Sequence, residues 1–383
     1  MEINKQQIAE AKSWLQNNYY FANKETIQID QDNDNDLFLS ISERYEDETQ
    51  ISSDDFIELI DELKSSEVNS KLIKTRKRII YSLDYYSDSI YDNIDDTDFE
   101  DDNIYISFIK VDILILILYV KYLDHSHKYF DSMQLPYFVE VYIKRNNLSN
   151  QHIENLVKSF LFESSNKLHL PLSIVKIGTH NNPEYGQINN TTEWDSEFES
   201  MELSDRFHKL KRYNPLMQDF IKSIKTPDLN LQFLGFFKIL EHCGVILLQQ
   251  DLYVNLKNRI ELGVDINKLE DLQEIVNIVG QAKKNRQMEY IITSLFKQIK
   301  FTEYKNYLPE KLKKLLDNDI IKKLISFRNA VCHDKANYFD KEDIGSYISK
   351  EDEFCQLNLF MKKITYSTIN WHINNLDKLG LKI

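Results

Sequence analysis

The spacing of apolar residues divides the chain into a half with mixed strand and helix patterns and a half dominated by helical spacing. Ile3, Ile8, Ala11, Trp14 and Leu15 recur at near-helical intervals, which predicts an amphipathic helix at the start. Further helices are expected over 56–63 and 151–162, and strands over 37–41, 104–109, 137–143 and 168–177. This alternation of strands and helices predicts an α/β N-terminal domain with some parallel pairing.

The run from Ile113 to Val120 leaves two structures open. Its continuous, largely β-branched apolar residues fit a buried strand or a core helix, and periodicity does not separate the two. Asp112 and Lys121 flank the run, which falls well short of the roughly 20 apolar residues that span a bilayer. We therefore expect no membrane insertion.

Residues 178–200 lose all periodicity and are rich in Asn, Thr, Pro, Gly and acidic residues, as in a linker or surface loop. We place the domain boundary there, giving domains over 1–200 and 201–383. In the second domain helices are expected over 213–224, 231–250, 269–282, 288–299, 317–332 and 353–376. The predicted fold class is therefore two-domain α+β, an α/β domain followed by an all-α helical bundle.

Charge is shared unevenly between these halves. Residues 1–200 hold 18 Lys and Arg against 37 Asp and Glu, a net of −19, whereas residues 201–383 hold 29 against 24, a net of +5. A mildly basic C-terminal half suits an RNA backbone, which binds largely through phosphate neutralisation. The acidic half should repel nucleic acid, so we interpret it as a regulatory, sensor or protein-binding domain.

The cysteines indicate a reducing compartment. Cys243, Cys332 and Cys355 form an odd set without metal-ligand spacing. The N-terminal residues also lack the features of a secretory signal, so a cytoplasmic location is expected. We expect no metal and no cofactor.

One acidic segment has the spacing of a calcium loop. Asp32, Asp34, Asp36 and Glu43 match four of its positions, but Leu37 replaces the glycine that its tight turn requires. A polar turn is therefore favoured over a calcium site.

The candidate chemistry lies at the end of the predicted helix over 317–332. Arg328, Asn329 and His333 form an Arg-Asn-x-x-x-His pattern. Arginine offers a permanently charged fork of donors for phosphate oxygens, and histidine exchanges protons near neutral pH. Together they could handle a phosphate and cleave RNA without a metal.

Helix geometry leaves the arrangement of this pattern open. On an ideal helix Asn329 and His333 share a face, whereas Arg328 and His333 are offset by about 140°. Either the helix ends near Cys332, or Arg328 and His333 of two subunits combine across a two-fold axis.

The pattern resembles the signature of the HEPN superfamily. A second segment, 233–242, is similar to the earlier core helix of HEPN proteins, in which an apolar face ends in a glutamate, here Glu241. The resemblance implies an all-α domain that dimerises, brings two motifs together in a cleft, and cleaves RNA with the RNA's own 2′-hydroxyl. Glu241 would orient Arg328 or His333. Some family toxins carry a tyrosine two residues after the histidine, where this chain has Lys335.

Basic residues at the start of the helical half and beside the motif are candidates for holding RNA. The segment 206–213 interleaves cations with Phe207, His208 and Tyr213, so it could bind the backbone and stack a base, or be a basic helix face. The candidate RNA-binding residues are Arg206, Lys209, Lys211, Arg212 and Lys335.

The resulting expectation is a metal-independent HEPN endoribonuclease, acting in bacterial anti-phage defence by abortive infection or as a toxin. Its partners would be RNA, including tRNA, a second copy of the chain, and an inhibitory or activating protein bound through the acidic domain. One alternative is a non-catalytic HEPN-type module for dimerisation or partner binding, in which Arg328 supports the helix end. Another is a nucleotide-sensing regulator that works through the N-terminal domain.

Overall fold

The chain forms two compact units. One comprises residues 1–161 and 172–210, and the other residues 162–171 and 211–383. The computed structural model describes residues 5–18, 27–33, 36–41, 49–83, 97–109, 114–115, 117–118, 138–145, 148–168, 171–177, 207, 209–265, 267–284, 287–332 and 351–375.

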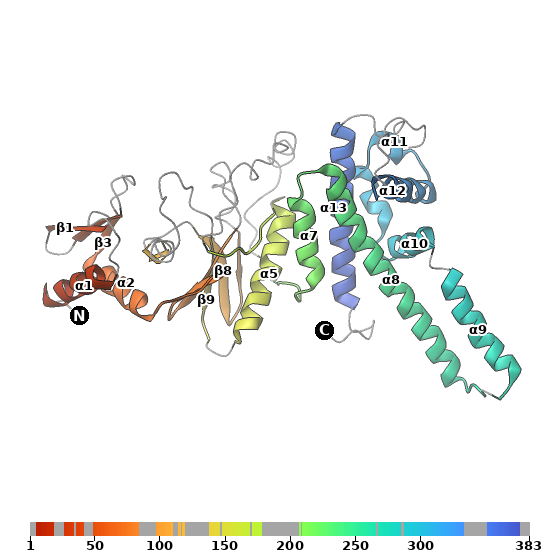
Figure 1. The fold of residues 1–383 in the computed structure, drawn as a ribbon, viewed down its shortest axis with the longest axis horizontal. Helices are drawn as coiled ribbons and strands as arrows, with labels where there is room; N and C mark the ends of the chain where they lie inside the picture. The colour runs from red at the N-terminus through yellow and green to blue at the C-terminus, as the bar shows by residue number, and fades with distance from the viewer. Residues whose placement is uncertain are drawn as a thin grey trace. The chain divides into compact units, whose positions relative to one another are not determined.

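The N-terminal unit is built on antiparallel sheets (Figure 1). A three-stranded sheet has the order β1-β2-β3, with bounds Ile27–Asn33, Asp36–Ile41 and Thr49–Ser52. A six-stranded sheet has the order β4-β5-β6-β9-β8-β7, with bounds Glu67–Val68, Leu72–Lys74, Arg78–Ser82, Phe138–Ile143, Ile104–Ile109 and Asp98–Glu100. The predicted strands over 37–41, 104–109 and 137–143 are confirmed as β2, β8 and β9.

Two expectations for this unit are wrong. Every pairing between these strands is antiparallel, and the parallel pairing among the described residues is limited to one isolated bridge between Phe99 and Phe207, so the expected parallel strands are absent from the described sheets. Tight turns explain part of this, because the short links between β5 and β6 and between β7 and β8 can only join antiparallel neighbours. In the predicted strand 168–177, the described residues contain a single bridge, from Ile174 to Leu83.

Helices cover both faces of the six-stranded sheet. α1 (Lys5–Asn18) and α2 (Ser53–Ser65) pack on the face that carries Ile80 and Phe138. α5 (Asn150–Lys167) lies on the opposite face, where the rings of Phe108 and Phe160 are 4.9 Å apart. In the run 113–120 the described residues are helical and fully buried in the cluster of α1 and α2, which favours the core helix: Leu114, Ile115, Ile117 and Leu118.

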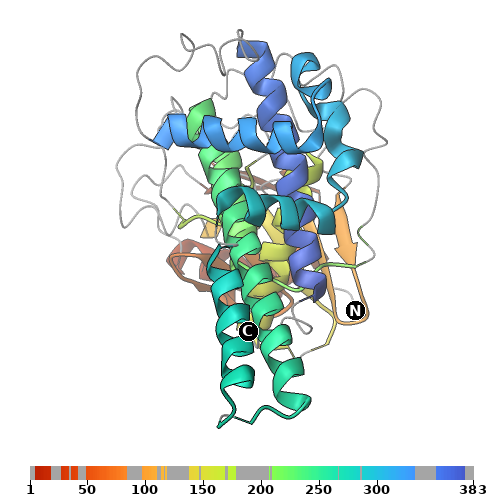
Figure 2. The same ribbon diagram turned by 90° about the vertical axis from the view of Figure 1, so that its right-hand side faces the viewer.

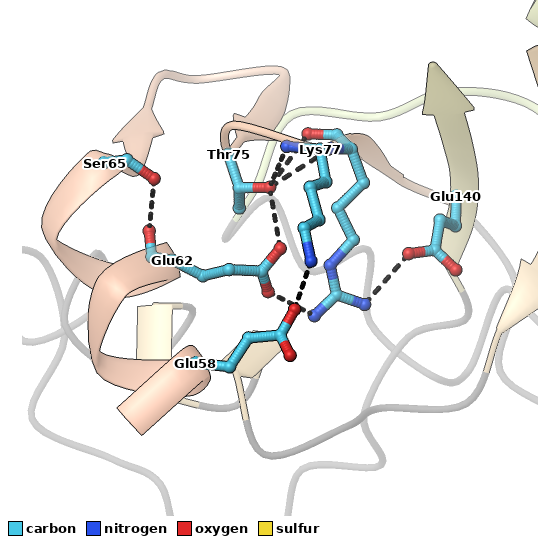
Figure 3. Close-up of polar contacts among 7 residues, drawn as sticks. Glu58, Glu62, Ser65, Thr75, Lys77 and Glu140 are labelled. Carbon is cyan, nitrogen blue, oxygen red and sulfur yellow. Dashed lines mark hydrogen bonds and ion pairs between the residues drawn. The ribbon is translucent and has the colours of Figure 1, made fainter. Parts of the chain in front are cut away.

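A cluster of ion pairs fixes α2 to the sheet (Figure 3). The guanidinium of Arg78 on β6 donates to Glu140 of β9 at 2.9 Å and to Glu62 of α2 at 3.1 Å. These three side chains are only 13–16% exposed. The hydroxyl of Thr75 also donates to Glu62, at 3.3 Å, and Lys77 pairs with Glu58. Arg78 thus compensates two carboxylates that are largely removed from water.

Replacing Arg78 by alanine should therefore destabilise this unit. The loss leaves Glu62 and Glu140 close together without their shared cation, at a cost of about 2 to 4 kcal/mol. Urea denaturation of the full chain, followed by circular dichroism, measures the change. Lys144→Ala is the matched control, because the Lys144–Glu100 pair is more than one-third exposed and should contribute less than about 1 kcal/mol. Equal effects of the two substitutions would contradict this assignment.

The C-terminal unit is helical. The helices predicted over 213–224, 231–250, 269–282, 288–299, 317–332 and 353–376 are confirmed, with α8 extending eleven residues beyond its predicted end. Their bounds are α7 Pro215–Lys225, α8 Leu229–Glu261, α9 Leu269–Lys284, α10 Met288–Gln298, α12 Asp317–Cys332 and α13 Glu351–Asn375. Two short elements lie between α10 and α12: the 3₁₀ helix η3 Phe301–Tyr307 and α11 Glu310–Lys313.

α8 is the central helix of this unit (Figure 2). The side chain of Asp228 caps its N-terminus by accepting from the backbone N–H groups of Asn230 and Leu231. Gly244 admits α10, because a Cβ at this position would lie 2.5 Å from the side chain of Ile291. The rest of the core comes largely from aromatic residues of α8 and from α13.

α8 is also long and apolar enough to cross a membrane when judged by length and composition alone, the single such helix among the described residues. Its N-terminal half, however, buries Phe233, Phe236, Phe237 and Leu240 inside the unit. The core helix of a soluble protein has the same composition, so this finding is weak evidence for a membrane span.

Candidate active site

Aromatic packing positions the helix that carries the candidate site. The apolar residues of α12 recur at three- and four-residue intervals and are buried: Ile320, Ile321, Leu324 and Phe327. The ring of Phe327 lies edge-on to Phe233 of α8, at 4.7 Å between centroids, and to Phe354 of α13, at 5.1 Å. The last turns of α12 are therefore held against both helices, and Arg328 follows directly.

Arg328 forms an ion pair with Glu241 of α8. Phe233, Phe237 and Glu241 succeed one another at four-residue intervals, so one face of α8 supplies the aromatic contact and then the carboxylate. The guanidinium Nη2 of Arg328 lies 3.0 Å from a carboxylate oxygen of Glu241, and Nη1 donates to the side-chain oxygen of Asn329 at 3.1 Å. The structure thus brings together three of the predicted site residues.

The environment of Glu241 raises the pKa of its carboxyl above the ordinary value. Burial raises the pKa of this carboxyl, and the charge and hydrogen bond of Arg328 and the charge of Lys238 lower it without cancelling the increase. Lys238 is exposed, and the sequence interpretation did not single it out. Its position three residues before Glu241, and so on the same side of α8, was the signal that could have identified it.

Arg328 keeps donors for a ligand. A guanidinium has five N–H groups, and the contacts with Glu241 and Asn329 use one on each terminal nitrogen. The Arg328 side chain is 28% exposed, and Asn329 is exposed on the same helical turn. A guanidinium that is oriented by a carboxylate and open on one side can bind phosphate oxygens.

Three predicted site residues lie outside the described residues: Arg206, His333 and Lys335. α12 ends at Cys332, immediately before His333. Both arrangements of Arg328 and His333, within one chain or across two subunits, therefore stay open.

The other candidate RNA-binding residues occupy different surroundings. Lys209 and Arg212 are exposed. Lys211 is 27% exposed and lies 3.0 Å from a carboxylate oxygen of Glu163, and its ammonium also donates to the hydroxyl of Tyr366 at 3.1 Å. That hydroxyl donates in turn to Glu163 at 2.6 Å. Lys211 is thus part of a packed polar triad.

The aromatic residues of this segment are also packed. The ring of Phe207 contacts that of Phe160 edge-on, and Tyr213 packs against the core of the helical unit. The described residues 209–214 are not helical, so the basic segment is not a basic helix face there.

Lys211 and Arg328 approach different parts of α13. Lys211 contacts Tyr366, whereas Phe327, the neighbour of Arg328, contacts Phe354. These two positions on α13 are roughly 18 Å apart at 1.5 Å per residue. The structure therefore does not place Lys211 beside Arg328.

Among the described residues, no group of three or more His, Cys, Asp or Glu side chains is arranged to hold a metal ion. Of the calcium-like segment, Asp34 and Glu43 lie outside these residues. No protein-family model matches the chain, and no curated protein or solved structure is significantly similar to it. The HEPN resemblance therefore rests on the sequence alone, on the motif residues and on the segment 233–242.

The raised pKa of Glu241 predicts a pH-dependent effect of Glu241→Gln. Because the folded protein binds this proton more tightly than the unfolded chain, the ionisation of Glu241 removes stability as pH rises from the unfolded pKa through the raised folded pKa. The variant lacks this titration. Its stability relative to wild type should therefore increase between pH 4 and pH 7, as measured by urea denaturation.

The control for this experiment is Glu310→Gln. The pKa of Glu310, which is fully exposed, is lowered by its hydrogen bond and ion pair with Lys313. Its substitution should therefore show no increase in relative stability with pH. A constant or falling difference for Glu241→Gln would show that the arginine outweighs burial.

Proposed function

We propose that the helical unit is a HEPN-type endoribonuclease that cleaves RNA without a metal ion. The observation that supports this most directly is the pair of Arg328 and Glu241. It places the arginine of the Arg-Asn-x-x-x-His motif at a partly exposed position, with its guanidinium oriented and with donors to spare.

In the proposed reaction the RNA supplies its own nucleophile. His333 accepts the proton of the 2′-hydroxyl, the 2′-oxygen forms a bond to phosphorus, and the bond from phosphorus to the 5′-oxygen breaks. The leaving 5′-oxygen takes a proton, from the partner's histidine or from water. Arg328 stabilises the negative charge on the non-bridging oxygens, with Glu241 as its positioning residue. The products carry 2′,3′-cyclic phosphate and 5′-hydroxyl ends.

Charge suggests how the other residues and the N-terminal unit contribute to the proposed function. Asn329 orients the substrate or fixes the motif, while Lys238, together with Arg206, Lys209, Arg212 and Lys335, attracts the RNA backbone. The acidic N-terminal unit serves as the regulatory part, through a protein partner or a signal. By analogy with the family, we further propose that the protein forms a homodimer that joins two motifs. Its substrate would be a tRNA or another RNA, and it would act in anti-phage defence or as a toxin.

Cleavage of total RNA and tRNA in EDTA tests this proposal. The wild-type protein should leave 2′,3′-cyclic phosphate ends, and Arg328→Ala and His333→Ala should each reduce the rate about 100-fold or more. Arg145→Ala, which removes an exposed arginine of the N-terminal unit, is the control and should retain the rate. Cleavage that persists in both motif variants, or that requires a divalent metal, would contradict the proposal.

The ion pair also supports a second candidate, a non-catalytic module in which Arg328 only stabilises the fold. In that case Arg328→Ala leaves Glu241 partly buried without its partner and should cost about 1 to 3 kcal/mol in thermal or urea denaturation. Arg328→Lys separates the two functions. Lysine keeps the charge beside Glu241 and should retain most of the stability, but it lacks the fork that binds phosphate, so a catalytic role predicts loss of cleavage.

A further inference from the structure

α10 and α12 expose a surface beside the candidate site. The two helices contact each other, and both contact α8 (Figure 2). In the first turn of α10, Ile291 packs so closely on Gly244 of α8 that a Cβ there would lie 2.5 Å from its side chain. Gly244 follows Glu241 by three residues, so the two are neighbours on the surface of α8. The first turn of α10 is therefore close to the carboxylate that orients Arg328.

α12 supports the same placement. The ammonium of Lys322 lies 3.7 Å from a carboxylate oxygen of Glu289, in the first turn of α10. Arg328 follows Lys322 by six residues, or roughly 9 Å along the helix axis. The side chains of this pair are 57% and 50% exposed. A pair so exposed to water contributes little stability, and an ammonium has three N–H donors, so Lys322 remains able to bind a phosphate.

The outer sides of both helices are polar, with one aromatic ring. Four apolar residues of α10 are buried: Ile291, Ile292, Leu295 and Phe296. Tyr290 and Lys297 are exposed on the opposite side, and because they are seven residues apart they lie on one line along the helix. On α12, Lys322 and Asn329 are exposed at the same spacing, away from its own apolar face. The surface therefore offers a ring, two cations and an amide.

Tyr290 is unusual in its exposure. In the described part of the helical unit, the exposed aromatic residues are Tyr253, at 64%, and Tyr290, at 43%. Tyr253 is nine residues beyond Gly244 on α8, roughly 13 Å along the axis, whereas Tyr290 directly precedes Ile291, which contacts Gly244. An exposed ring can stack on a nucleic-acid base, an interaction of about 1 to 3 kcal/mol.

The positive charge of the C-terminal half gathers in the same region. Residues 288–332 hold nine Lys and Arg against five Asp and Glu, a net of +4 out of the +5 of residues 201–383. The exposed acidic residues of this region each pair with a lysine: Glu289, Glu303 and Glu310. The region therefore attracts a polyanion, since no exposed carboxylate in it is left uncompensated.

We propose that Tyr290 stacks on an unpaired base of the RNA, and that Lys322 and Lys297 bind the phosphates beside that base. This inference rests on the proposed function, because it takes the scissile phosphate to lie at Arg328. Tyr290 and Arg328 belong to neighbouring helices, so the stacked base is a few nucleotides from the cleaved bond. A base inside a duplex is already stacked and paired. Tyr290 therefore selects RNA that is unpaired beside the cleavage position.

Fluorescence anisotropy of the full chain with a labelled 2′-O-methyl RNA measures this binding, because such RNA lacks the nucleophile and stays intact. Tyr290→Ala should weaken binding of the single strand about tenfold, whereas Tyr290→Phe keeps the ring and should retain the affinity. The matched control is Tyr253→Ala, which removes the other exposed tyrosine and should leave the affinity unchanged. These positions are exposed, so the variants should keep the wild-type melting temperature.

Charge variants test the phosphate contacts. Lys322→Gln should weaken binding and lower the slope of log Kd against log salt concentration by about 0.7. Lys257→Gln is its control and should do neither, because Lys257 forms a similarly exposed pair with Glu261. Glu289→Gln removes a negative charge next to Tyr290 and should strengthen binding about twofold or more.

Three results would overturn the proposal: unchanged binding by Tyr290→Ala, an equal loss in Tyr253→Ala, or equal affinity for the same RNA annealed to its complement. The nuclease is judged separately. If Tyr290→Ala binds like wild type while Arg328→Ala loses cleavage, this surface is not the RNA site and the proposed function stands. If Tyr290→Ala loses binding but the wild type cleaves no RNA, the surface binds RNA and the catalytic proposal fails.

Discussion

The packing of Phe327 between Phe233 and Phe354 is the contact on which the candidate site depends. It joins α12 to α8 and α13 at the turn where the motif begins, so the position of Arg328 is set by aromatic burial and not by its own polar contacts. The ion pair with Glu241 then selects one direction for the guanidinium. Because a partly buried pair contributes little net stability, its main effect is to orient a cation that would otherwise sample many rotamers.

The helical half could be predicted closely because each helix has its own apolar periodicity. In α12 the residues Ile320, Ile321, Leu324 and Phe327 repeat on one face, so the local sequence and the packing agree. The pairing of the strands in the six-stranded sheet was harder to predict from the sequence. β5 and β6 are short, and Arg78 lies on a largely buried part of the sheet, where it is compensated by Glu62 and Glu140. No local pattern reveals such a partner, and strand order along the chain does not determine whether neighbours are parallel.

The same distinction applies to the candidate site. Arg328, Asn329 and Glu241 were identified from motif residues and helix position, and their contact requires only that α8 and α12 pack along the faces that their apolar residues define. Lys211 differs. Its partners Glu163 and Tyr366 come from distant parts of the sequence, so a run of cations looked like a binding segment although one member is held in a polar triad. A charge run predicts positive potential, but tertiary contacts decide which cations are available.

α8 continues beyond the candidate site, and its change of surroundings shows where packing ends. Up to Leu247 most of its apolar residues are buried in the core of the unit, whereas its C-terminal part extends alongside α9 (Figure 1). An apolar helix that leaves its core needs a partner for its exposed face, and one neighbouring helix covers only one side. Val245 is 41% exposed and lies one turn after Glu241. Glu241 and Val245 therefore lie on the solvent-facing side of α8, at a level where its other side is still buried through Cys243 and Leu247.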